Sequence, residues 1–182
     1  MAGDWICENC DYRSTQGEVQ ILLDRLQERI KVLKYQDSIK MFEDTLNELE
    51  KELHPNNYLC MKVKRVLILL YGNRDTFDPE NDIEVICRKL QLCQNYLETY
   101  SKVDQGYTSW KGKVLEEMVG PYMLHTKFLL NNGQIGEDTY AQNYKASIRM
   151  IVEASKCRQY DPDSSRMFMA WCLKDINDVI SG

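Results

Sequence analysis

Hydrophobic residues recur at steps of three and four positions along most of the chain, which is the spacing of amphipathic helices. The first such run covers residues 16–34 and follows Thr15, which together with Glu18 has the spacing of a capping box. A second run, DSIKMFEDTLNELEKEL, predicts a helix that begins at Asp37 or Ser38. Because the connection between the two runs is short, we expect them to form an antiparallel hairpin.

Proline is expected to mark the start of three later helices, because a residue in the first turn of a helix needs no amide donor. The pairs are His54-Pro55, Asp78-Pro79 and Asp161-Pro162, and the helices predicted after them cover about 56–71, 79–102 and 163–180. A further helix is expected from Glu137-Asp138 onward.

The segment 106–133 is also helical in pattern, except at Gly120-Pro121. The missing amide and the ring of Pro121 are expected to kink or split this helix, and Gly133 is expected to end it. No segment shows the alternation of apolar and polar residues, bounded by turn residues, that is typical of strands. Strands are therefore expected only around the CxxC of residues 7–10.

These patterns predict an all-α fold of six to eight helices arranged as antiparallel hairpins. Two joints, LHPNNYLCMK and YDPDSSRMFM, are similar, since each has an X-Pro pair followed by polar residues and an apolar helix. The similarity indicates a degenerate repeat resembling tetratricopeptide hairpins. We therefore expect a helical domain over residues 15–182, preceded by a short N-terminal segment, residues 1–14.

Composition narrows the class of partner. The chain has 43% hydrophobic and 28% charged residues, as is typical of a globular protein, and a net charge of −5. Both signs of charge are mixed along the helices, which argues against nucleic acid, because phosphate backbones require a basic face. The densest basic run, MKVKR at 61–65, is interpreted as a solvated helix face.

The sequence shows neither a membrane span nor a secretory signal, and this indicates where we expect the protein to be located. No apolar stretch approaches the ~20 residues of a membrane span, and VLILLY at 66–71 is interpreted as a buried helix segment. The start, MAGDWICENC, has neither the basic nor the apolar region of a secretory signal. We expect a reducing compartment, the cytoplasm or the nucleus, without membrane attachment.

Seven cysteines are present, and five of them lie in apolar helical patterns where small core residues are expected. These five are Cys60, Cys87, Cys93, Cys157 and Cys172. The other two, Cys7 and Cys10, follow Trp5 with CxxC spacing and are the candidate metal ligands.

Zinc takes four ligands in structural sites, so Cys7 and Cys10 would be half of a site. His54 and His125 are disfavoured as further ligands, because neither has zinc-finger spacing. Two other interpretations stay open. One is a thioredoxin-like redox pair, which would need a βαβ context that the chain lacks. The other is an N-terminal tail with two reduced thiols, which would need no particular structural context.

No catalytic or cofactor-binding residues are predicted. Nucleophilic catalysis needs a histidine base oriented by a third group, and neither histidine has such a setting. The carboxylate pairs Glu116-Glu117 and Glu48-Glu50 are interpreted as solvated helix faces. No glycine-rich loop follows a strand and opens a helix, as phosphate binding would require.

The order of motifs resembles the C-terminal half of SET- and MYND-domain protein lysine methyltransferases, particularly arthropod members. The resemblance is carried by W-x-C-x-x-C, then a helical hairpin, then LHPNNYLCMKVKRVLILLYG at 53–72, then RKLQLCQNYLETYSKVDQGYTSWKGKVLEEM at 88–118. The joint typically reads LHPNHY in that family, so Asn57 departs from it. Gln105-Gly106 also departs, where proline-glycine is more usual.

The resemblance implies a helical, tetratricopeptide-like domain that shapes the substrate cleft of the enzyme and binds protein partners. It implies that Cys7 and Cys10 are the downstream half of a zinc site, whose other cysteine pair lies upstream in relatives. The family's S-adenosylmethionine pocket and catalytic residues precede this region, so we expect a non-catalytic fragment that does not bind that cofactor. The alternative is a free-standing helical-repeat module that binds proteins.

The resemblance also suggests contact residues for a protein partner. Candidates are the aromatic residues Tyr96, Tyr100, Tyr107 and Trp110. The competing interpretation is that they belong to the core, because aromatic residues of amphipathic helices usually face inward.

Overall fold

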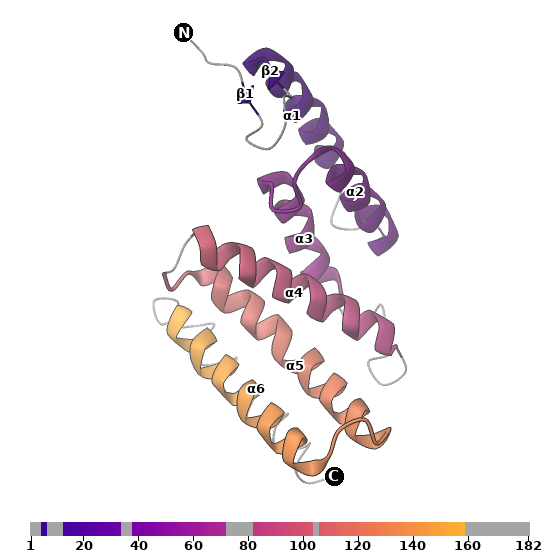
Figure 1. Ribbon diagram of the computed structural model, residues 1–182, viewed down its shortest axis with the longest axis vertical. Helices are drawn as coiled ribbons and strands as arrows, with labels where there is room; N and C mark the ends of the chain where they lie inside the picture. Colours follow the sequence, from indigo (N-terminus) through magenta and orange to yellow (C-terminus); the bar gives the residue numbers. More distant parts are fainter. Residues whose placement is uncertain (1–4, 7–12, 34–37, 72–81, 104–105, 159–182) are drawn as a thin grey trace. The chain divides into compact units, whose positions relative to one another are not determined.

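The computed structural model describes residues 5–6, 13–33, 38–71, 82–103 and 106–158. This part of the chain is almost entirely helical, so the predicted all-α class is confirmed (Figure 1). The elements are β1 Trp5–Ile6, β2 Arg13–Ser14, α1 Gln16–Lys31, α2 Ile39–Glu52, α3 Tyr58–Leu70, α4 Ile83–Val103, α5 Ser109–Asn131 and α6 Glu137–Cys157. The helix predicted over 163–180 and the proposed start at Asp78-Pro79 lie outside the described residues.

The chain divides into two compact units, Met1–Val66 and Leu67–Gly182, and the boundary falls within α3. In the first unit, α1 begins with the predicted capping box. The Thr15 hydroxyl accepts from the Glu18 amide at 3.2 Å, and the Thr15 amide donates to Glu18 Oε2 at 2.8 Å. Ser38, one of the two predicted caps, caps α2.

The two helices of this hairpin are antiparallel. Two ion pairs link them, Arg25 with Glu52 and Arg29 with Glu48, so that the residue further along α1 meets the residue that comes earlier in α2. Leu26 and Ile30 of α1 and Leu46 and Leu49 of α2 are buried. The apolar stripe read from the sequence is therefore the buried face.

The start of α3 differs from the prediction. Pro55 does not lie in the first turn of the helix, because residues 54–57 form a separate turn in which the Asn57 amide donates to the His54 carbonyl at 2.8 Å. The helix begins at Tyr58, and the Asn57 side chain accepts from the Leu59 amide at 3.0 Å. Asparagine caps this helix, and proline shapes the turn before it.

In the second unit, α4, α5 and α6 lie side by side with α5 in the middle (Figure 1). Lys89 of α4 pairs with Glu117 of α5 at 2.7 Å, and Lys111 of α5 pairs with Glu153 of α6 at 2.6 Å. The Tyr122 hydroxyl lies 3.2 Å from Asn143 Oδ1, twenty-one residues away in sequence. These pairs make the consecutive helices antiparallel, as expected.

The expected split at Gly120-Pro121 is wrong, since α5 runs without interruption from Ser109 to Asn131. Pro121 has no amide to give to the carbonyl four residues earlier, and this loss destabilises an isolated helix. Packing compensates for it, because Met118, Val119 and Met123 around the proline are buried. The helix is held by its neighbours and not by its own hydrogen bonds alone.

Gly133 ends α5 as predicted. Its φ of 66° is the only positive value among the described residues. The Gly133 amide donates to the Leu130 carbonyl and the Gln134 amide to the Leu129 carbonyl, each at 2.9 Å. This is a Schellman motif, which needs a residue that adopts the left-handed conformation without strain.

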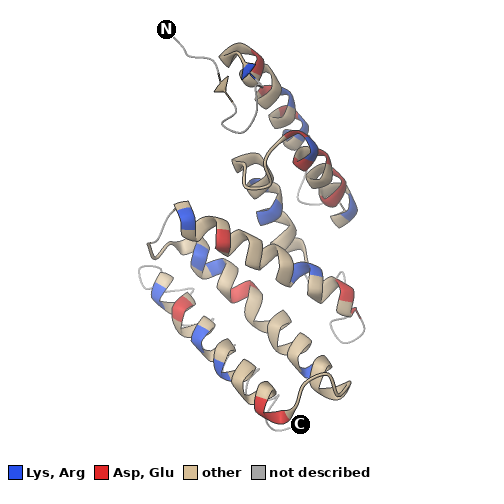
Figure 2. Ribbon diagram, in the orientation of Figure 1, with Lys and Arg blue, Asp and Glu red and all other residues tan. Residues whose placement is uncertain are grey.

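Charges of both signs occur on α1, α2, α4, α5 and α6, whereas α3 carries only Lys62, Lys64 and Arg65 (Figure 2). The mixed pattern agrees with the sequence. No helix among the described residues is long and apolar enough to cross a bilayer.

Candidate functional site

The two short strands bracket the CxxC. Trp5 pairs with Ser14 and Ile6 with Arg13, in antiparallel register, so β1 and β2, which flank residues 7–12 in the sequence, form a short hairpin. Within the described residues strands occur only on either side of the cysteine pair, as expected. Cys7 and Cys10 themselves lie outside the described residues.

The hairpin is fixed to the start of α1 by one carboxylate. Glu18 Oε2 accepts from the Thr15 amide at 2.8 Å, from the Thr15 hydroxyl at 3.0 Å and from the Ser14 hydroxyl at 3.2 Å. The bond from the Thr15 amide, followed by those from the two hydroxyls, lowers the pKa of Glu18 below its usual 4.5. The last residue of β2 and the cap of α1 therefore share an acceptor, which links the hairpin to the start of α1.

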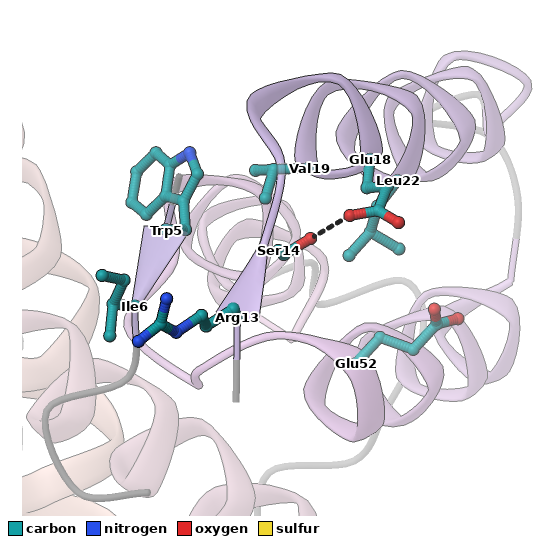
Figure 3. A pocket seen from close by; sticks show the side chains of 8 residues that line it. All are labelled: Trp5, Ile6, Arg13, Ser14, Glu18, Val19, Leu22 and Glu52. Carbon is teal, nitrogen blue, oxygen red and sulfur yellow. Dashed lines mark hydrogen bonds between the residues drawn. The ribbon is translucent and has the colours of Figure 1, made fainter. Parts of the chain in front are cut away.

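A groove lies between the hairpin and the helices of the first unit (Figure 3). It has a volume of about 660 Å³ and is open to solvent. Its lining residues are Trp5, Ile6, Arg13, Ser14, Glu18, Val19, Leu22 and Glu52. Trp5 and Ile6 are each 61% exposed, which is unusual for large apolar side chains that stand next to one another.

Two of the three charged side chains that line the groove have hydrogen-bond or ion-pair partners among the described residues. Glu18 accepts the three bonds given above, and Glu52 is paired with Arg25 of α1. Arg13, by contrast, is exposed and makes no ion pair or hydrogen bond with any other described residue. Within the described residues the positive charge of Arg13 thus has no counter-charge, and it lies beside two exposed apolar side chains.

Neither histidine contributes to a metal site among the described residues. His54 Nδ1 accepts from the Asn56 amide at 3.1 Å within the turn before α3, and His125 lies inside α5 in the other unit. No group of three or more histidine, cysteine or acidic side chains that could hold a metal occurs in the described part of the chain. That His54 and His125 are not zinc ligands stays a prediction, because the thiols of Cys7 and Cys10 lie outside the described residues.

Buried ion pairs replace some of the solvated faces expected from the sequence. Lys64 is 4% exposed; its amine lies 2.8 Å from Glu50 Oε1 and donates to the Pro55 carbonyl at 3.0 Å. The interpretation of MKVKR as a solvated face is therefore wrong for Lys64. The lysine closes the turn before α3 against α2, because a buried ammonium needs compensating acceptors.

The interpretation of Glu116 and Glu117 as a solvated pair is also wrong. Glu117 pairs with Lys89, which is 3% exposed, and Glu116 pairs with Arg158 near the end of α6. Glu116 Oε1 is buried without a hydrogen-bond partner among the described residues, and burial raises the pKa of this carboxyl group. The sequence did hold a signal for Lys89, since it lies between Ile86 and Cys93 on the apolar stripe of α4.

The described cysteines are poor nucleophiles. Burial raises the pKa of Cys93 to about 12, and burial also raises the pKa of Cys60 and of Cys157. A thiol whose pKa is raised is protonated at neutral pH and reacts slowly. Cys87 is exposed, so its assignment to the core is wrong, whereas the assignment of the other three is confirmed. Cys172 lies outside the described residues.

The aromatic contact candidates divide between core and surface. Tyr96 is 4% exposed and stacks on Tyr100, with ring centroids 5.6 Å apart, so Tyr96 belongs to the core. Trp110 is half-buried beneath the Lys113 amine, which lies 5.5 Å from the ring centroid. Tyr107 is 60% exposed and is the candidate with most surface for a partner. Sequence spacing missed Trp5 and Ile6, because both lie outside the helical patterns.

Comparison with models of protein families, with curated proteins and with solved structures finds no match to this chain.

Proposed function

We propose that this chain is a non-catalytic, protein-binding helical domain of the kind that ends SET- and MYND-domain protein lysine methyltransferases. In this proposal the helical hairpins are tetratricopeptide-like, and Cys7 and Cys10 are half of a structural zinc site. The domain acts inside the cell, in the cytoplasm or the nucleus, where it shapes a substrate cleft and binds a protein partner.

The observation that carries the proposal is the hairpin around the CxxC. Trp5 pairs with Ser14, and Ser14 donates to Glu18 of the capping box, so the strands on either side of the cysteine pair lie at the entry to the helices. This order of a two-thiol hairpin, a capped helical hairpin and the LHPN turn is the order on which the family resemblance rests.

The chemistry of the described side chains supports a binding role. Cys93 has a pKa of about 12, and Lys89 and Lys64 are buried in ion pairs, so these groups are not available as nucleophiles or bases. Methyl transfer requires a bound sulfonium donor and an aligned lysine. In the parent family S-adenosylmethionine supplies that donor from a pocket that precedes the helical domain.

Zinc content tests the proposal directly. Two thiolates leave a tetrahedral zinc ion with two open positions, so the chain alone should bind well under one zinc per molecule. A longer version of the chain, extended at its N-terminus by a segment that carries a second cysteine pair, should bind close to one zinc per molecule. Metal content is measured by mass spectrometry after dialysis against a weak chelator.

Cys7→Ser and Cys87→Ser form a matched pair for this measurement, because Cys87 is an exposed cysteine on α4. In the extended version Cys7→Ser should abolish stoichiometric zinc, and Cys87→Ser should leave it unchanged. Equal zinc content in the two variants would refute the assignment of Cys7 as a ligand.

A free-standing interaction module is the second candidate. It is favoured by the groove itself, since the exposed side chains of Trp5 and Ile6 line it and a binding surface of this kind needs no methyltransferase. Transcript sequence upstream of Met1 separates the two candidates. A cysteine pair and a SET motif in frame favour the first, and a stop codon immediately upstream favours the second.

A further inference from the structure

We draw no further inference here: the strongest candidate, the groove beside the N-terminal hairpin with the exposed apolar side chains of Trp5 and Ile6 in its lining, carries none, because nothing in the structure shows what covers it.

Discussion

The approach of α6 to α5 depends on the absence of a side chain at one position. A Cβ atom built on Gly112 would lie 2.8 Å from the Cβ of Cys157 and 2.8 Å from the Cγ of Arg158, and 3.2 Å from the carbonyl oxygen of Ala154. The Arg158 contact can be relieved by rotation of its long side chain. The other two cannot, because they involve the backbone of α6 and an atom attached to it.

Gly112→Ala should therefore destabilise the second unit even though alanine is the better helix former. Alanine in place of glycine stabilises a helix interior by about 1 kcal/mol. Overpacking by one methyl group against atoms that cannot move away costs about 1–3 kcal/mol. Because two of the contacts are with the backbone region of α6, we expect the upper part of that range, and a net loss of about 1–2 kcal/mol.

Gly120→Ala is the control in the same helix. Apart from its chain neighbours and its own helix, a Cβ atom on Gly120 would meet nothing within 4 Å. The gain in helix propensity is offset in part by the ring of the following Pro121, so this variant should change stability by less than about 1 kcal/mol. Urea unfolding followed by circular dichroism at the helical minimum gives both free energies. If Gly112→Ala proves as stable as Gly120→Ala, the close contact between α5 and α6 is not present in solution.

Three further outcomes follow from the buried charges and thiols. Lys89→Met should cost about 2–3 kcal/mol in urea unfolding, because it leaves the partly buried Glu117 charge uncompensated, and adding Glu117→Gln should recover most of the loss. If the double variant is as unstable as the single one, the ion pair is not the cause. Burial raises the pKa of Glu116 above 4.5, so the folded state retains a proton that the unfolded chain releases; stability should fall as pH rises from about 4.5 through the raised pKa, and Glu116→Gln should flatten this slope. Parallel slopes for variant and parent would contradict the burial of this carboxyl group. Iodoacetamide should label Cys87 at least about tenfold faster than Cys93 in the folded chain, as measured by peptide mapping, and comparable rates would mean that α4 does not bury Cys93.

The ends of the helices were predictable because their signals are local. The Thr15 and Glu18 capping box, the Ser38 cap and the left-handed Gly133 each require only residues within a few positions. Hydrogen bonds between a cap and the first or last turn form whatever the rest of the chain does. The start of α3 was misplaced because two local signals compete there, and the asparagine cap at Asn57 prevails over Pro55.

The candidate site was predictable in part. The sequence placed Cys7 and Cys10 in the only region where strands were expected, and the hairpin is there. It gave no indication of the groove, because its lining combines Trp5 and Ile6 of the hairpin with Val19 and Leu22 of α1, which only the folded chain brings together. A pattern of hydrophobic residues identifies a helix face, but it does not identify a surface made by two elements.

By itself the sequence determined the helical class, the apolar face of each helix and most helix ends, since all of these depend on interactions between near neighbours. Tertiary structure alone decided which charges are buried. Lys64 and Glu116 look like solvated residues in sequence, yet Lys64 is buried against Glu50 of α2, and Glu116 pairs with Arg158 at the end of α6. It also decided that α5 continues through Pro121, because burial between two neighbouring helices outweighs one lost hydrogen bond.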